Sequence, residues 1–343
     1  MNTLLDLQKK LLPDLVEVLG QRYRILRFIR LMQPIGRRTL AGNLEMSERV
    51  LRSEVTFLKE QGLIEFAPTG MTLTDEGNNL LSQLEVVMKD VFQTRTMEEE
   101  LKTRLGIKDV HIVPGDSDEY AWVQKEMGRT CVTLIKQRMA AENNVIAVTG
   151  GTSIAAVAEM LVPDSGLKET LFVPARGGLG EQVENQANTI CATMARKAMG
   201  SYRLLHVPDQ LSKEAYESLI SEPSVQDILR LIQSATMVIH GIGEAEAMAI
   251  RRNSSSRVLG ELKDKKAVAE AFGYYFNQSG EIIHKVLTIG LQLEDLEEIP
   301  CIIAVAGGAS KAEAIEAYMK RRPNQTLVTD EGAARAILAK NEV

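Results

Sequence analysis

The apolar positions that follow Ser47 have the spacing of an amphipathic helix. Leu51, Val55 and Leu58 are separated by four and three residues, which places them on one helical face. Ser47 is a residue type that caps helix N-termini well. We therefore predict a helix over Glu48–Lys59, with a buried apolar face and an exposed polar face.

Shorter elements are expected on both sides of this helix. Leu40, Ala41 and Leu44 give one apolar face to a short helix that precedes it. An extended segment begins at Leu63-Ile64, and a hairpin turn is expected around Ala67–Gly70. A short helix, a tight turn, a longer helix and a β-hairpin in this order predict a winged helix-turn-helix.

From Val110 onward the pattern changes to short β-branched runs, which lead into glycine and then into alanine-rich helical runs. These strand-like runs are Val145–Thr149, Leu171–Val173, Met237–Ile239 and Ile302–Val305. Alternating strands and helices predict an α/β domain with a doubly wound, mostly parallel sheet. We expect two domains, a winged helix-turn-helix over residues 1–90 and an α/β domain over residues 91–343.

A charged stretch without proline, over residues 75–105, is predicted to be helical and to join the two domains. It carries a wide apolar stripe that includes Leu80, Leu84, Val87 and Val91, with Leu81, Met88 and Phe92 beside it. The stripe fits a dimerisation helix, because helix-turn-helix proteins usually bind two half-sites as dimers. It fits equally well a helix that packs on its own domain, and both alternatives stay open.

Charge is distributed unevenly along the chain. The formal net charge is −6, yet residues 21–60 contain nine basic and four acidic residues, which gives that segment +5 and the remainder −11. A basic module joined to an acidic body indicates a polyanion-binding head on a domain that repels polyanions.

The exposed side of the predicted helix-turn-helix carries residue types that bind DNA. Arginine bridges O6 and N7 of guanine, hydroxyl groups bind bases or phosphates, and arginines at the start of the first helix suit the phosphate backbone. The candidate DNA-binding residues are Arg37, Arg38, Ser47, Arg49, Arg52, Ser53 and Thr56. A solvated amphipathic helix without a ligand is the alternative, and the charge of +5 nearby favours double-stranded DNA.

Composition excludes several classes of protein. A hydrophobic content of 45% and a mean hydropathy of −0.08 suit a globular chain, and the apolar runs are too short to span a bilayer. The N-terminus lacks the pattern of a secretory signal. Three widely spaced cysteines and four dispersed histidines predict neither disulfides nor a metal site. We expect a cytoplasmic protein that binds no membrane.

Two predicted strands end in a glycine pair, a hydroxyl residue and a helix. These turns are Gly150–Ser153 and Gly307–Lys311, and further glycine-rich turns occur at Val173–Gly180 and His240–Gly243. Glycine lets the backbone approach an anion closely, and free N–H groups at a helix start point towards it. In an open α/β sheet such turns gather at one edge. Two anion-binding turns on that edge predict a ligand with phosphate at both ends.

These turns differ from the common nucleotide-binding fingerprints. The spacing GxxxxGK[ST] is absent, which disfavours an NTPase. Gly178–Gly180 and Gly241–Gly243 lack the third glycine of a dinucleotide-binding motif at the required position.

Longer segments resemble the SorC family of sugar-responsive bacterial transcription regulators over essentially the whole chain. The segments that carry the resemblance are Gln33–Arg38, Ala147–Thr152, Phe172–Gly180, Gln186–Ala192, Glu270–Phe276, Ala304–Gly308 and Val328–Gly332. The resemblance implies a repressor of a glycolytic operon with fructose 1,6-bisphosphate as its allosteric effector and no cofactor. It also implies that the effector domain is similar to sugar-phosphate isomerases and deaminases.

The resemblance further implies where the effector binds. The implied effector-binding residues are Gly150, Gly151, Thr152, Ser153, Arg176, Gln186, Arg251, Glu270 and Lys311. Arg252 is adjacent to Arg251 and is the alternative contact at that position. Glu270 stands where many SorC relatives have aspartate.

Three functions are compatible with this combination of domains. The first is a repressor that binds operator DNA as a homodimer or homotetramer and responds to a sugar phosphate. The second is an isomerase- or deaminase-like enzyme with an appended DNA- or protein-binding module, which would need a positioned general base and acid. Glu270 and Asp330 are the carboxylates available for that role, and nothing in the sequence pairs them. The third is a winged helix that recruits protein. We expect the first, a regulator and not an enzyme.

Overall fold

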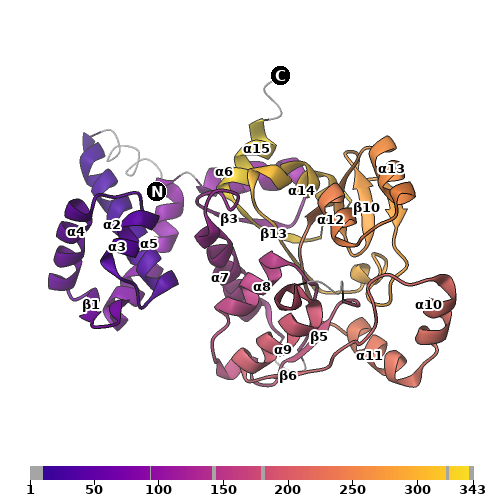
Figure 1. Ribbon diagram of the computed structural model, residues 1–343. Helices are drawn as coiled ribbons and strands as arrows, with labels where there is room; N and C mark the ends of the chain where they lie inside the picture. The colour runs from indigo at the N-terminus through magenta and orange to yellow at the C-terminus, as the bar shows by residue number, and fades with distance from the viewer. Residues whose placement is uncertain (1–10, 93, 141–143, 179–181, 322–323, 340–343) are drawn as a thin grey trace. The chain divides into compact units, whose positions relative to one another are not determined.

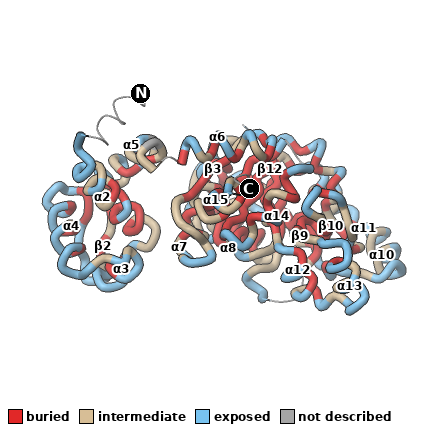
Figure 2. Tube along the Cα trace, turned by 90° about the horizontal axis from the view of Figure 1, so that it is seen from above, coloured by how far each residue is buried: buried red, intermediate tan, exposed pale blue. Residues whose placement is uncertain are grey.

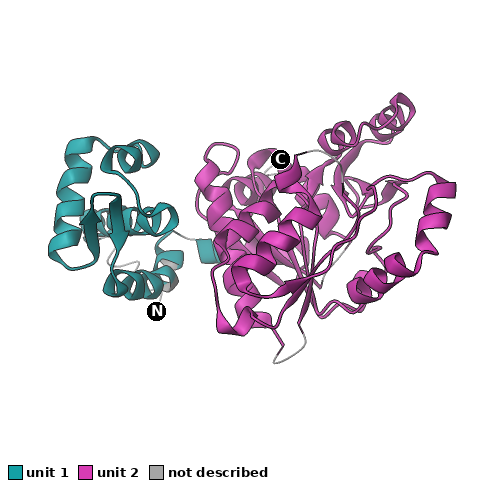
Figure 3. Cartoon of the chain, turned by 60° about the horizontal axis from the view of Figure 1, so that its bottom comes forward, with its two compact units in different colours: residues 1–96 teal, residues 97–343 magenta. Residues whose placement is uncertain are grey.

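The computed structural model describes residues 11–92, 94–140, 144–178, 182–321 and 324–339. The chain divides into two compact units, residues 1–96 and 97–343 (Figure 3). The predicted division between residues 90 and 91 lies near the end of the helix that closes at Val91, whereas the boundary between the two units follows Thr96, within the first turn of the next helix.

The N-terminal unit has the predicted order of elements. They are α2 (Pro13–Met32), α3 (Arg37–Asn43), α4 (Glu48–Glu60), β1 (Ile64–Ala67), β2 (Gly70–Leu73) and α5 (Asp75–Val91). Strands β1 and β2 pair antiparallel around the expected turn. Ser47 caps α4, since its hydroxyl accepts the N–H of Val50 at 3.3 Å. Leu51, Val55 and Leu58 are the buried residues of α4, as their spacing predicts.

The apolar stripe of α5 is divided between the core and the surface. Leu81 and Met88 are almost fully buried, whereas Val87 is 40% exposed and Leu80 and Leu84 are half-buried. Helix α5 therefore packs on its own unit through one face, with α2 as its main neighbour. A second apolar face remains partly accessible. The charged stretch is also two helices and not one, because α6 begins separately at Thr94.

The C-terminal unit is an α/β domain built on a seven-stranded sheet. Its helices are α6 (Thr94–Leu105), α7 (Ala121–Arg138), α8 (Thr152–Met160), α9 (Ala187–Ala198), α10 (Lys213–Ile220), α11 (Pro223–Gln233), α12 (Ala245–Arg251), α13 (Ser256–Asp264), α14 (Ala312–Met319) and α15 (Glu331–Ala339). The strands of this sheet are β3 (Asp109–Val113), β4 (Val145–Val148), β5 (Leu171–Pro174), β6 (Ser201–Tyr202), β7 (Met237–His240), β12 (Cys301–Val305) and β13 (Thr326–Asp330). All its strand pairs are parallel.

Helices cover both faces of this sheet (Figure 1). On one face, α7, α8 and α9 pack on side chains such as Ile146 and Val148. On the other face, α6, α11, α14 and α15 pack on side chains such as Ala147 and Val238. Successive residues of a strand point to opposite faces, so strands buried on both faces become continuous apolar runs. The strands accordingly form the buried centre of the unit (Figure 2).

The strand order places a topological switch in the middle of the sheet. The order is β3-β13-β12-β7-β4-β5-β6, so the chain runs from β4 outward through β5 and β6 before it returns to β7. Strands β4 and β7 are neighbours, with Val148 opposite Ile239. The turns after them diverge to different helices. Ligands of open α/β sheets bind at such a point, at the carboxyl ends of the strands.

A second, antiparallel sheet of four strands was not predicted from the sequence. It consists of β8 (Gly243–Glu244), β9 (Ala267–Ala271), β10 (Tyr274–Asn277) and β11 (Ile282–Lys285) in the order β11-β10-β9-β8. Strand β8 comes directly after the β7 turn, so this sheet begins beside the switch point. Glu270, on β9, is thereby brought towards the carboxyl edge of the large sheet.

Two further features concern the environment of the chain. Its three cysteines are free thiols, with Cys131 and Cys191 buried. Within the described ranges, no helix has the length and apolar character needed to cross a membrane.

Candidate functional site

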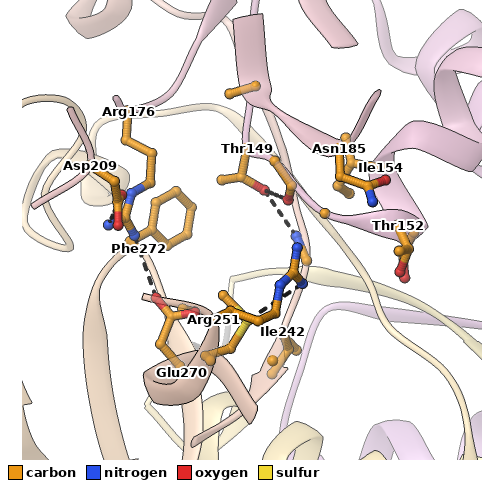
Figure 4. A pocket seen from close by; sticks show the side chains of 18 of the residues that line it. Thr149, Thr152, Ile154, Arg176, Asn185, Asp209, Ile242, Arg251, Glu270 and Phe272 are labelled. Atoms are coloured by element: carbon orange, nitrogen blue, oxygen red, sulfur yellow. Dashed lines mark hydrogen bonds and ion pairs between the residues drawn. The ribbon is translucent and has the colours of Figure 1, made fainter. Parts of the chain in front are cut away.

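A cavity lies at the carboxyl edge of the large sheet, at the switch between β4 and β7. Its empty volume is about 1060 Å³, including the part that opens to solvent. Residues that follow β4, β5, β7 and β12 line it, together with residues of α12 and β9. The close view in Figure 4 places Arg176 and Thr152 on opposite sides of this cavity, with Arg251 between them.

The first glycine turn presents unpaired backbone donors to the cavity. Within the described residues, the N–H groups of Thr152, Ser153 and Ile154 at the start of α8 have no hydrogen-bond partner. Gly151 adopts a φ of 120° and donates its own N–H to the carbonyl of Asn185 at 2.8 Å. A Cβ on Gly150 would lie 2.7 Å from that same carbonyl oxygen, so this tight turn requires glycine. Free backbone donors and the positive end of a helix dipole are groups that favour a negatively charged ligand.

Two cations that line the same cavity form no ion pair with a carboxylate of the described residues. The ammonium of Lys311 makes no ion pair or hydrogen bond within the described part of the chain. The Nη1 of Arg251 lies 3.9 Å from the sulfur of Met248. Burial lowers the pKa of Lys311, while the nearby carboxylates of Asp118 and Asp330 oppose that effect. An anion bound at α8 would stabilise the charged form of Lys311.

The opposite wall of the cavity is a buried cluster of four charges. Arg252 donates to Asp209 at 2.8 Å and to Glu270 at 2.8 Å, and its Nη1 donates to the hydroxyl of Tyr275 at 3.0 Å. Arg176 forms ion pairs with the same two carboxylates. The four side chains are each at most 7% exposed, so two arginines and two carboxylates cancel one another's charge inside the protein.

The cluster fixes the roles of two adjacent arginines. Arg252 is committed to Asp209, Glu270 and Tyr275, whereas Arg251 is half-buried and extends into the cavity. The Nη2 of Arg176 pairs with Asp209, and its Nε is buried without a hydrogen-bond partner among the described residues. A buried donor without a partner is costly, and an anionic ligand would satisfy it.

Glu270 uses one of its two carboxylate oxygens in this cluster. Its Oε1 accepts from Arg252 and also from the N–H of Gly273 at 2.6 Å. Among the described residues, Oε2 has no hydrogen-bond partner. Gln186 begins α9 and lines the cavity close to the first glycine turn.

The second glycine turn differs from the prediction that it binds a phosphate. Its backbone donors are already occupied by carboxylates of the same chain. The N–H of Gly308 donates to Asp330 at 2.7 Å, and the N–H of Ser310 donates to Asp118 at 2.8 Å. The hydroxyl of Ser310 also contacts Asp118, at 3.1 Å. Lys311 is therefore the part of this turn that reaches the cavity, and the second cradle is not free for a ligand.

His240 is the last residue of β7 and is a neutral side chain. Its Nδ1 lies 3.0 Å from the carbonyl of Gly241, and its Nε2 lies 3.2 Å from the side-chain oxygen of Gln325. Burial lowers the pKa of His240 to about 4. The cavity therefore gains no positive charge from this histidine near neutral pH.

The N-terminal unit presents a separate polar surface on α4. All seven predicted DNA-binding residues, from Arg37 to Thr56, are exposed. A shallow depression on α4 is lined by Arg49, Arg52, Ser53, Thr56, Phe57 and Glu60. Arg38 pairs with Glu48 at 3.6 Å on the surface. Arg49 and Arg52 are exposed cations of α4 beside the depression.

Comparison with known proteins assigns a family to each part of the chain. Residues 89–339 match a sugar-binding domain family, and residues 18–88 match the family of the CggR N-terminal DNA binding domain. The chain is 58% identical to the central glycolytic genes regulator of Priestia megaterium and 60% identical to that of Bacillus subtilis. Each alignment spans 338 residues, 98% of this chain and 99% of the relative.

A solved structure extends the similarity to the fold. The crystal structure of a SorC family transcriptional regulator from Enterococcus faecalis is 47% identical, with a TM-score of 0.68 over 71% of this chain and 99% of that one. The chain belongs to the SorC family. It is a transcriptional regulator with a DNA-binding domain and a sugar-binding domain, which excludes the enzyme and the protein-recruiting module considered above.

The structure brings all nine residues implied by the SorC resemblance to one cavity. They come from the turns after β4, β5 and β12, from the first residues of α8, from the N-cap of α9, from the end of α12 and from β9. Sequence analysis missed Asp209, because no motif or regular element surrounds it, although it holds both Arg176 and Arg252. The residues Leu179 and Gly180 of the third predicted glycine turn lie outside the described residues.

The contrast between Arg251 and Arg252 gives a direct test of the cluster. Arg252→Met leaves Glu270 and Asp209 buried with one arginine, so we expect a loss of about 3 kcal/mol in the free energy of unfolding. Arg251→Met removes a cation without a carboxylate partner and should cost less than about 0.5 kcal/mol. Urea denaturation followed by the fluorescence of Trp122, the single tryptophan, measures both. Equal unfolding midpoints for the two variants would contradict a structural role of the cluster.

Proposed function

We propose that this regulator represses a glycolytic operon in the cytoplasm. We further propose that fructose 1,6-bisphosphate binds in its cavity and lowers its affinity for operator DNA. The observation that carries the proposal is the free start of α8, flanked by Lys311 and Arg251, at the switch point of the sheet. The names of the two curated relatives, central glycolytic genes regulators, support the choice of operon and of a glycolytic sugar phosphate.

One phosphate of the effector would bind at α8. The N–H groups of Thr152 and Ser153 would donate to its oxygens, and Lys311 and Arg251 would neutralise its charge. The turn at Gly150 and Gly151 lets the backbone approach closely enough for these contacts.

The second phosphate would lie towards Arg176, across the cavity. The occupied donors of the turn at Gly308 exclude that turn as its site. The Nε of Arg176 has no hydrogen-bond partner among the described residues, and its side chain lies on the other side of the cavity from Thr152 (Figure 4). The free Oε2 of Glu270 and the side chain of Gln186 would then bind sugar hydroxyls between the phosphates.

Operator binding would use α4 in the major groove. Arg49, Arg52, Ser53 and Thr56 stand on its exposed face, where arginines and hydroxyls contact base edges. Arg37 and Arg38 begin α3 and suit backbone phosphates. A homodimer or homotetramer would present paired copies of α4 to two half-sites, and the half-exposed face of α5 that contains Val87 is a surface available for pairing.

The effector would act through linkage. A sugar bisphosphate that favours one arrangement of subunits changes the fit of paired α4 helices to the half-site spacing. Effector and operator then bias the same equilibrium from separate domains, without direct contact between them.

Calorimetry with fructose 1,6-bisphosphate and fructose 6-phosphate tests the effector proposal. We expect the bisphosphate to bind at least tenfold more tightly, because the second phosphate gains charge-assisted hydrogen bonds worth about 1.5–3 kcal/mol. Lys311→Met should weaken both ligands by a similar factor, since both place a phosphate at α8. Equal affinities for the two sugars in the unmodified protein would rule out a site with two phosphate positions.

Salt-dependent gel shifts test the operator surface. Arg52→Ala should weaken operator binding by about tenfold and, if Arg52 contacts a phosphate, lower the slope of log K against log salt by about 0.9. The variant should bind the effector as the unmodified protein does, because Arg52 and the cavity belong to different units. A variant with wild-type operator affinity would show that α4 is not the reading helix.

A further inference from the structure

Arg22, a residue outside the predicted DNA-binding set, reaches from α2 to the exposed flank of α4. Its Nε donates to the carboxylate of Glu54 at 2.7 Å. Its guanidinium carbon lies 3.7 Å from the centre of the Phe57 ring. Glu54 and Phe57 are three residues apart, so they are neighbours on one side of the helix. One arginine therefore holds α4 by a charge-assisted hydrogen bond and by a cation–π contact.

This contact borders the surface that would read DNA. Phe57 lines the same shallow depression as Arg49, Ser53 and Thr56, and it is 36% exposed. Helix α4 packs mainly on α3 and β1. The side chain of Arg22 adds a link to α2, on the flank of α4 that carries Glu54.

The charge of Arg22 has a second consequence. Glu54 is on the proposed reading helix, and an uncompensated carboxylate there would repel the phosphates of DNA. The ion pair cancels that charge, and both side chains are partly screened from solvent, with 32% of Arg22 and 18% of Glu54 exposed. Arg22 directs its Nε to Glu54 and its planar face to Phe57, so these groups are not available to a DNA phosphate. Lysine has no planar group for the stacking half of this contact.

We infer that Arg22 is a positioning residue for operator binding. It holds α4 in place through its contacts with Glu54 and Phe57 and does not itself contact DNA. This inference rests on the proposed role of α4 as the reading helix. It adds α2 to the parts of the chain that determine operator affinity.

The test compares Arg22→Ala with the unmodified full-length protein in operator titrations at several salt concentrations. We expect affinity to fall by about tenfold while the slope of log K against log salt stays the same, because no phosphate contact is lost. Arg24→Ala is the matched control, since Arg24 is exposed on the same helix and has no partner among the described residues. The control should change affinity by less than about twofold, within the range of a neutral surface substitution.

Two further variants separate positioning from direct contact. Glu54→Gln added to Arg22→Ala removes the uncompensated charge and should recover at least about threefold of the lost affinity. Arg22→Lys should remain weaker than the unmodified protein, because lysine loses the stacked contact. A slope lowered by about 0.9 in Arg22→Ala, with full rescue by lysine, would instead make Arg22 a phosphate contact and overturn the inference.

Arg52→Ala provides the reference for interpreting a negative result. If Arg52→Ala and Arg22→Ala both bind operator as the unmodified protein does, the assignment of α4 is wrong. If Arg52→Ala loses affinity and Arg22→Ala does not, the inference about Arg22 alone is wrong. Thermal unfolding followed by circular dichroism identifies a variant whose N-terminal unit fails to fold. If Arg22→Ala fails to fold, Arg22→Met is used in its place, because methionine keeps an apolar side chain next to Phe57.

Discussion

The backbone donors at the start of α8 are the constraint on which the rest of the cavity depends. The first N–H groups of any helix have no partner within the helix, and here those of Thr152, Ser153 and Ile154 meet no other group of the described chain. The diverging turns after β4 and β7 keep neighbouring strands from covering them. Lys311 and Arg251 add positive charge at the same place, so an anion is the ligand that satisfies the site best.

The buried charge cluster supports this site from the other side. Arg176 follows β5, Asp209 lies in the segment after β6, Arg252 follows α12, and Glu270 is on β9. Mutual ion pairs hold these four separate segments together and leave no net charge at that wall. The cavity thus has one end where Lys311 and Arg251 form no ion pair with a carboxylate of the described residues, and one end where two arginines and two carboxylates balance one another. A cavity whose two ends differ in this way can fix the orientation of a sugar phosphate.

Sequence alone predicted the regular parts of the fold and of the site. The spacing of Leu51, Val55 and Leu58 predicted the buried face of α4, and the glycine pair at Gly150 predicted a turn with free backbone donors at the start of a helix, because both depend on local geometry. The occupied turn at Gly308 was not predictable. Its carboxylate partners, Asp118 and Asp330, come from other parts of the chain, and the side chain that fills a turn is a tertiary property.

The antiparallel sheet and Asp209 were missed for the same reason. Strand β8 has two residues and carries no pattern of its own, and Asp209 is held by long-range ion pairs. For Arg251 and Arg252 the sequence left two candidates, and their different burial assigns one to the cavity and one to the cluster.

Reciprocal linkage between the two domains is the most direct test of the account. Operator affinity is measured with and without saturating fructose 1,6-bisphosphate, and effector affinity is measured with and without saturating operator. The account predicts that each ligand weakens the other by the same factor, of about tenfold or more. An operator affinity that stays unchanged when the cavity is saturated would contradict it.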